Sequence, residues 1–327
     1  MKFKMPDLKF PLAGAPVVVG RHFRFPLSAF RICRAFSLIE ILVVVSLLSL
    51  IVVALMAVFS STQRAFRSGI TQTDMLEGGR AAVDLITTDL HGLAPSGGAH
   101  GGNYPVSVAN LNFLVADNAS YSTPLLQPLS GGTVSRPNLL QQVFVLNRYN
   151  LQWWGVGYAV ATNSGDGLFA LYRMVYPVTT NGIGTNNPAA IYSAFNNFFA
   201  SPTNGGSHLV NGVVNFTVRA YDKNGYWIFT NSSSSAAYTN FAQAGNTFLF
   251  TNQYGETGMA LYSNVVPAAV ELNLAVVEDR ALARAESFPT FSGRTNYLSQ
   301  QSGAVHVFRQ RVIIPNVDRM AYYPTNQ

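Results

Sequence analysis

Cysteine is nearly absent from this sequence, since Cys33 is the only one in 327 residues. A single thiol cannot close a disulfide within the chain, so cross-linked folds are excluded. The chain also lacks the cysteine clusters that hold zinc or iron–sulfur centres. Nothing after Cys33 can act as a thiolate nucleophile.

Excess charge is absent from most of the chain. The net charge is +6, but residues 1–35 contain seven Lys and Arg residues against a single acid, Asp7. Of the 21 basic and 15 acidic residues in total, 14 of each remain after residue 35. This neutral part predicts no nucleic-acid partner. The basic segment is typical of the cytoplasmic flank of a membrane span.

Catalytic motifs are lacking as well. The sequence contains no G-x-S-x-G, no H-E-x-x-H and no phosphate-binding P-loop. The histidines after residue 35 are scattered: His91, His100, His208 and His306. Oxygen ligands for a cation are conceivable at two places, Glu278-Asp279 with Glu286, and Asp222 with Asn224. Neither set has the residue spacing of a known oxygen-ligand site, so we expect these acids to lie in turns or on the surface. We therefore expect a protein that is not an enzyme and has no metal or cofactor.

One long apolar run is present, Phe36–Phe59, and it contains no proline and one charge, Glu40. As a helix its 24 residues span about 36 Å, enough to cross a bilayer. The run is too long for a secretory signal, and Ser60-Ser61-Thr62-Gln63 is a poor cleavage site. An uncleaved anchor fits the hydropathy but leaves unexplained a carboxylate that is costly within a membrane.

The residues Arg34-Ala35-Phe36-Ser37-Leu38-Ile39-Glu40 resemble the cleavage and methylation motif of type IV pilins and pseudopilins. In that family a small residue precedes Phe, a hydroxyl residue, Leu, Ile and Glu, which open a long apolar helix. The resemblance implies that prepilin peptidase cuts between Ala35 and Phe36 and that the new amine of Phe36 is methylated. It also implies that Glu40 meets the Phe36 amine of a neighbouring subunit and sets the register of a filament.

A helical pattern continues beyond the span. Apolar residues recur at spacings of seven, three, four and three: Leu76, Val83, Ile86, Leu90 and Leu93. Charged residues fall mostly between them: Asp74, Glu77, Arg80, Asp84 and Asp89. We expect one helix from Phe36 to about Leu93, with a membrane half (36–60) and a periplasmic half (61–95) that packs on the remaining domain. A bend at Gly69 or Gly78-Gly79, giving two helices, is the alternative.

Residues 96–327 favour a β-rich globular domain, so the expected fold class is α+β. Alternating runs bounded by turn residues predict strands at Val143–Tyr149, Trp154–Ala161, Leu168–Tyr176, Val214–Tyr221, Tyr226–Thr230, Val270–Val276 and Val305–Ile314. Two segments rich in Asn, Ser, Thr, Gly and aromatic residues, 179–207 and 231–258, are expected to be long loops.

Part of this domain is similar to the J-type minor pseudopilin of type II secretion. The similarity lies in Gly212-Val213 with Phe216, in Tyr221-Asp222 before Gly225 and Trp227, and in Val266–Leu272. It implies a structural subunit near the tip of a periplasmic pseudopilus. Its implied partners are prepilin peptidase, major and minor pseudopilins and the inner-membrane assembly platform. The implied location is a single pass through the inner membrane, with a cytoplasmic N-terminus before cleavage and a periplasmic C-terminal domain.

Two other functions remain open at this point. The first is a type IV minor pilin for adhesion, motility or DNA uptake, with the aromatic, Asn-rich loops as adhesive surfaces. The second is a periplasmic binding or enzymatic domain held by an uncleaved anchor. The chemistry of the mature N-terminus discriminates the second from both filament proteins.

Overall fold

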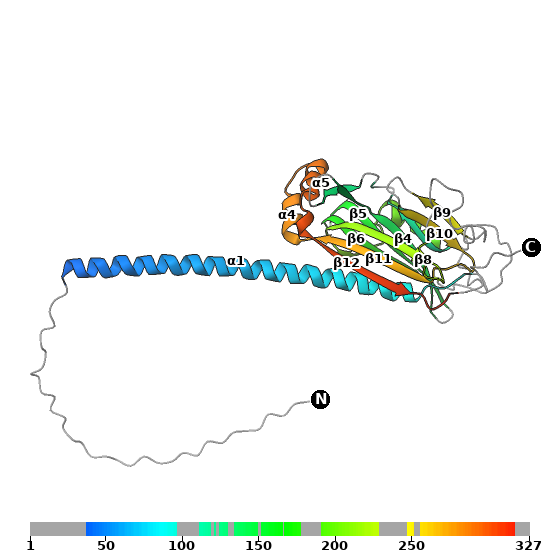
Figure 1. The fold of residues 1–327 in the computed structure, drawn as a ribbon, viewed down its shortest axis with the longest axis horizontal. Coiled ribbons are helices and arrows are strands. Elements are labelled where there is room, and N and C mark those ends of the chain that lie inside the picture. Colours follow the sequence, from blue (N-terminus) through cyan, green and yellow to red (C-terminus); the bar gives the residue numbers. More distant parts are fainter. Residues whose placement is uncertain are drawn as a thin grey trace, which may run out of the picture. The chain divides into compact units, whose positions relative to one another are not determined.

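The computed structural model describes residues 37–96, 111–118, 121, 124–129, 134–149, 152–165, 167–177, 191–228, 247–251 and 256–317. The fold class is α+β, with one long helix and a domain rich in antiparallel sheet (Figure 1). The chain divides into two compact units, Met1–Thr62 and Gln63–Gln327. The predicted leader, residues 1–35, lies outside the described residues.

Helix α1 runs from Leu38 to His91 as one 54-residue α-helix, so the predicted single helix is confirmed and the alternative with a bend is wrong. Ser37 begins the helix, because its carbonyl accepts hydrogen bonds from the backbone N–H groups of Glu40 and Ile41. In the second half, a stripe of residues is buried: Met75, Gly79, Ala82, Val83, Ile86, Asp89 and Leu90. Leu76, predicted in this stripe, is only half-buried, and Met75 takes its place.

The larger sheet has seven antiparallel strands in the order β7-β6-β5-β4-β1-β10-β9. Their bounds are β1 Leu111–Asp117, β4 Gln141–Tyr149, β5 Gln152–Ser164, β6 Gly167–Pro177, β7 Ser207–Val210, β9 Thr247–Thr251 and β10 Thr257–Tyr262. The predicted meander is confirmed as β4, β5 and β6, which pair in sequence order. Strands β1, β7, β9 and β10 were not predicted.

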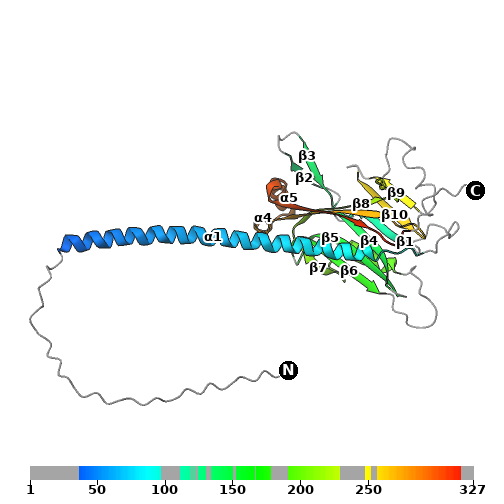
Figure 2. The same cartoon turned by 60° about the horizontal axis from the view of Figure 1, so that its bottom comes forward.

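A smaller antiparallel sheet consists of β8 (Val213–Tyr221), β11 (Ala269–Val277) and β12 (Val305–Ile313), in the order β12-β11-β8. All three were predicted. Strands β2 (Leu125–Pro128) and β3 (Ser135–Asn138) form a separate hairpin, which Figure 2 shows beside the helix α5. Helices α4 (Asp279–Glu286) and α5 (Phe291–Ser299) and the short turn η4 (Ser302–Ala304) lie between β11 and β12 in the chain.

The strand predicted at Tyr226–Thr230 is wrong for the part that the structure describes. Residues 226–228 contain a single bridge, between Trp227 and Tyr221. The reason is the side chain of Asp222, whose Oδ1 accepts hydrogen bonds from the backbone N–H groups of Asn224 and Tyr226. These bonds hold the chain in a turn, as short acidic side chains often do.

Regular elements occupy parts of the two predicted loops. The first contains η3 (Tyr192–Ala194) and α2 (Phe195–Ala200), and the second contains β9 and the start of β10. The apolar side chains of α2, Phe195, Phe198 and Phe199, are buried. A six-residue helix is marginal alone, so burial of these rings stabilises it. Residues 179–190, 231–246 and 252–255 of the two segments lie outside the described residues.

Each face of the larger sheet contributes to its own hydrophobic core. Along β4, Val143 and Val145 join a cluster with the second half of α1 and the smaller sheet, whereas Phe144 and Leu146 join a cluster with α2. This alternation follows from the period of two along a strand. The larger sheet is therefore covered on both faces.

The Gly78-Gly79 pair lets α1 approach both sheets closely. A Cβ at Gly78 would lie 3.9 Å from Val210 of β7, and one at Gly79 would lie 2.3 Å from the Phe308 ring of β12. A side chain at Gly79 is therefore excluded unless the ring moves. The pair thus serves close packing here rather than a bend.

We expect Gly79→Ala to lower the free energy of unfolding by about 1–2 kcal/mol, because the displaced Phe308 ring outweighs the better helix propensity of alanine. Gly69→Ala is the matched control, since no atom lies within 4 Å of its added Cβ, and it should gain up to about 1 kcal/mol. Urea unfolding followed by tryptophan fluorescence checks both. Equal gains for the two variants would show that Phe308 imposes no constraint.

Candidate functional site

Glu40 lies in the first turn of α1 and is the only charged residue from Ser37 to Phe59. Its backbone N–H bonds the Ser37 carbonyl at 2.9 Å, and the Ser37 hydroxyl oxygen lies 3.3 Å from the same nitrogen. A carboxylate also suits the positive end of the helix dipole. The helix N-terminus thus favours a carboxylate at this position, but the described residues provide its charge with no counterion.

The other polar side chains of this stretch are satisfied within the helix. The hydroxyl of Ser46 donates to the Val43 carbonyl and that of Ser49 to the Ser46 carbonyl, both at 2.8 Å. Hydroxyls bonded to the preceding turn need no water, so they are tolerated in hydrocarbon. Glu40 is therefore the one group in the stretch whose charge calls for a partner outside its own helix.

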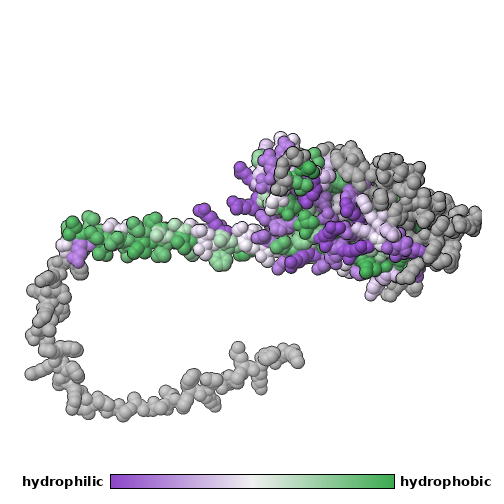
Figure 3. Space-filling model, in the orientation of Figure 1, coloured by the Kyte–Doolittle hydropathy of each residue, from purple (hydrophilic) through white to green (hydrophobic). Residues whose placement is uncertain are grey.

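The first part of α1 exposes nearly all of its apolar surface. The large apolar side chains from Leu38 to Phe59 have exposed fractions between 46% and 83%. Figure 3 shows this stretch as an almost unbroken apolar surface. Among the described residues, α1 is the one helix long and apolar enough to cross a membrane. The chain therefore has a surface suited to lipid or to other apolar helices.

Of the three predicted site residues, the structure describes only Glu40. Ala35 and Phe36, the predicted cleavage site and methylated residue, lie outside the described residues. Glu40 lies two residues after the start of α1 at Leu38.

Asp89, one of the charged residues between the predicted apolar positions of the helix, belongs to a polar cluster in the domain. Asp89 is buried, and its two carboxylate oxygens accept hydrogen bonds from Arg173 Nε and Nη2 of β6, both at 2.8 Å. The fully buried Tyr158 hydroxyl of β5 donates a short hydrogen bond to the same carboxylate. The cluster ties the second half of α1 to two neighbouring strands.

The electrostatics of this cluster favour a fixed ionisation state. Burial and the adjacent Asp89 raise the pKa of Tyr158 far above its usual value, so the phenol stays protonated. The hydrogen bond to Asp89 raises the pKa of Arg173, which stays charged. Neither group titrates near neutral pH, so the cluster is an anchor rather than an acid–base pair. The burial of Asp89 could have been predicted from its spacing in the sequence. It follows Ile86 by three residues and precedes Leu93 by four, so it lies on the same face of the helix as these apolar residues.

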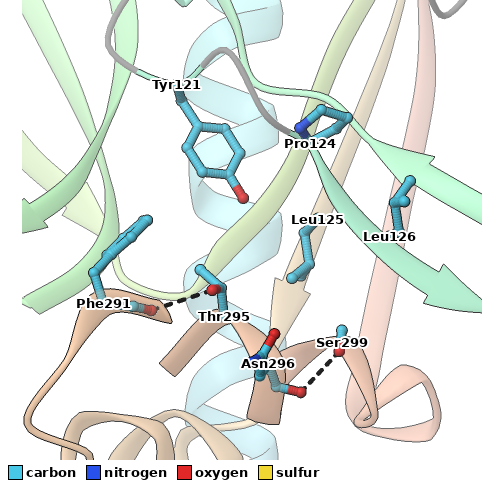
Figure 4. A pocket seen from close by; sticks show the side chains of 8 residues that line it. All are labelled: Tyr121, Pro124, Leu125, Leu126, Phe291, Thr295, Asn296 and Ser299. Carbon is cyan, nitrogen blue, oxygen red and sulfur yellow. Dashed lines mark hydrogen bonds between the residues drawn. The ribbon is translucent and has the colours of Figure 1, made fainter. Parts of the chain in front are cut away.

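A pocket of about 290 Å³ opens between the β2–β3 hairpin and α5 (Figure 4). Its lining is aliphatic, aromatic and neutral polar: Tyr121, Pro124, Leu125, Leu126, Phe291, Thr295, Asn296 and Ser299. The hydroxyl of Thr295 donates to the Phe291 carbonyl and that of Ser299 to the Asn296 carbonyl. Burial raises the pKa of the Tyr121 phenol to about 12, so it is not a base at neutral pH. The lining contains no carboxylate, imidazole, thiol or amine side chain.

Three of the four acids considered as cation ligands have other partners. Glu278 lies 3.1 Å from His306 Nε2, Glu286 accepts the backbone N–H of Leu168, and Asp222 holds its own turn. In the part of the chain that the structure describes, no three His, Cys, Asp or Glu residues gather as a metal site. His91 is exposed at the end of α1, His208 bonds Asn211, and His100 lies outside the described residues.

No protein-family model, no curated protein and no solved structure matches this chain. The site is therefore interpreted from its own residues: an exposed apolar helix that begins with Glu40, and a polar anchor that fixes the end of the same helix to a β-rich domain.

Proposed function

We propose that this chain is a minor pseudopilin, a structural subunit near the tip of a type II secretion-like periplasmic pseudopilus. The observation that carries the proposal is the position of the Ala35–Glu40 motif directly before and within the start of an exposed, membrane-length apolar helix. An ordinary anchor explains the apolar surface but gives no role to Glu40. A subunit that assembles through helix packing explains both.

In this proposal each part of α1 has a separate task. The first part leaves its apolar side chains free for lipid before assembly and for neighbouring helices afterwards. Glu40 pairs with the Phe36 amine of a neighbouring subunit, because a charge within an apolar assembly requires an opposite charge. The second part is fixed to the β-rich domain by Asp89 and by the hydrophobic core, so the position of this part of the helix determines the position of the domain. No catalytic step is needed, and we propose that the protein is not an enzyme.

The proposal predicts a mature chain that begins at a methylated Phe36. Prepilin peptidase would remove residues 1–35, and the mass of the N-terminal peptide would increase by one methyl group. Mass spectrometry of the membrane-extracted protein checks this. An intact Met1 would contradict the proposal and favour a tethered domain. A methylated Phe36 is shared with type IV minor pilins, and co-isolated partners separate the two: other pseudopilins support the secretion role.

A further inference from the structure

A second pocket, of about 230 Å³, lies between strand β3 and the outer face of the smaller sheet. Its floor is formed by outward residues of β8, β11 and β12: Asn215, Thr217, Asn273, Ala275 and Val307. Its sides come from Arg136 and Pro137 of β3, from Leu139, and from the Arg219–Glu256 pair. It is thus separate from the apolar helix and from the Asp89 cluster.

The lining carries a net charge of +1, from two guanidinium groups and one carboxylate. Arg219 is compensated, because its guanidinium forms a bidentate pair with Glu256 and lies over the Trp227 ring. The charge of Arg136 is not compensated. Its Nη2 donates to the neutral Gln127 Oε1, and no ion pair is formed with any of the described residues. A partly buried cation without a counterion favours an anionic ligand.

Two residues that line the pocket each have a buried polar atom to which the described part of the chain gives no hydrogen-bond partner. These atoms are Arg136 Nε, a donor, and Asn273 Oδ1, an acceptor. Buried polar atoms are rarely left unpaired in folded proteins, so each points to a missing group. One group must accept a hydrogen bond from the guanidinium, and the other must donate one to the amide oxygen.

We propose that this pocket binds a carboxylate carried by a polypeptide partner. The carboxylate would accept the Arg136 Nε–H, the charge-assisted geometry for which a guanidinium is best suited. A peptide N–H near that carboxylate would donate to Asn273 Oδ1. The apolar walls, Pro137, Leu139 and Val307, would contact the adjoining aliphatic groups. Because a small inorganic anion would leave Asn273 unpaired, the pair of orphan atoms favours a peptide.

The inference does not depend on the proposed function, because it rests on the pocket alone. Its test is calorimetric titration of the full chain in detergent micelles with acetyl-Ala-Asp-Ala-amide and with acetyl-Ala-Asn-Ala-amide. The aspartate peptide is expected to bind at least about tenfold more tightly, because only it supplies a charged acceptor. Acetyl-Ala-Ala-Ala with a free C-terminal carboxylate distinguishes a chain terminus from an acidic side chain as the natural source.

Arg136→Gln is expected to remove this preference, whereas Arg136→Lys should retain part of it through charge alone. Arg148→Gln is the matched control, since Arg148 is exposed on β4 over the Trp153 ring and does not line the pocket. Circular-dichroism melting shows whether each variant is folded. If Arg136→Gln does not fold, the Nε resonance of Arg136 in selectively labelled native protein must shift with the aspartate peptide alone. Equal affinity for the aspartate and asparagine peptides, binding of neither, or equal effects of the two glutamine variants would overturn the proposal.

Discussion

Asp89→Ala is expected to lower the free energy of unfolding of the β-rich domain by about 3 kcal/mol or more. The substitution leaves the Arg173 guanidinium beside a buried cavity without its counterion. It also removes the acceptor of the Tyr158 hydroxyl, which has no access to water because Tyr158 is fully buried. A buried charge or hydroxyl without a partner is destabilising by its full desolvation cost.

Removing one member of a buried ion pair typically costs about 3–5 kcal/mol. We expect a loss near the lower value because about a quarter of the Arg173 side chain is exposed, so water solvates part of its charge. Asp89→Asn should fall between alanine and the native residue, since the amide oxygen still accepts one hydrogen bond. Urea unfolding of the full chain in micelles, followed by fluorescence of Trp153, Trp154 and Trp227, measures these differences.

Asp84→Ala is the matched control for Asp89→Ala, because Asp84 is on the same helix but exposed. Its effect should stay within about 0.5 kcal/mol. If both variants were equally stable, the Asp89 cluster would not be the anchor of α1. A loss for Asp89→Ala that disappears in the Arg173→Met background would instead confirm that the uncompensated guanidinium causes it.

Glu40→Ala is expected to leave peptidase cleavage intact but to reduce co-isolation with partner pseudopilins at least about tenfold. The reason is that an amine of a neighbouring subunit, buried among apolar helices, would lose its only counterion. Removing one member of a buried ion pair typically costs about 3–5 kcal/mol, more than enough for this effect. The mature N-terminus and the co-isolated chains are measured by mass spectrometry of the same preparation.

Glu77→Ala serves as the control for Glu40→Ala. Glu77 is an exposed carboxylate of the same helix, beyond the apolar part. The two variants have the same change of charge and size, so a difference between them reports the position alone. Co-isolation that is undiminished by Glu40→Ala would contradict the role of Glu40 in assembly.

The elements that sequence predicted well have strong periodic signals. Apolar residues occupy every second position from Val214 in β8 and from Val270 in β11, and in both strands the inward residues, such as Phe216 and Leu274, belong to the core. The helix was predicted nearly to its ends because a continuous apolar run, Phe36–Phe59, is followed by apolar residues at helical spacings from Leu76 to Leu93. In these elements, local pattern and tertiary burial agree.

Other elements depend on contacts that a single sequence does not display. Helix α2 has two asparagines among three phenylalanines, so its sequence has no clear helical pattern. Its rings are buried only because they pack on the face of the larger sheet that includes Phe144 and Leu146. Strand β10 was missed because Gly258 and the polar residues before it suggested a loop. Helix α4 was not predicted, and Asp279 and Glu286 were interpreted as turn or surface acids, although Ala281, Leu282 and Ala285 are spaced as a buried helix face.

The candidate site was only partly predictable for a similar reason. Glu40 was recognised because a charge within an apolar run has no local explanation. Asp89 was missed because a charge within an amphipathic helix usually faces solvent. Its partners, Arg173 and Tyr158, are 84 and 69 residues away, so nothing in the local pattern revealed them.

The close approach at Gly78-Gly79 also bears on aggregation. Val210 and Phe308, which the helix contacts there, belong to β7 and β12, each of which is one of the two outermost strands of its sheet. An outermost strand has unpaired backbone groups that can recruit strands of other molecules. Because α1 contacts both strands, a domain expressed without residues 63–93 would open two such edges at once. We therefore expect the packed helix to prevent β7 and β12 from pairing with strands of other molecules. A chain whose helix has not yet packed on the sheets would be prone to aggregation.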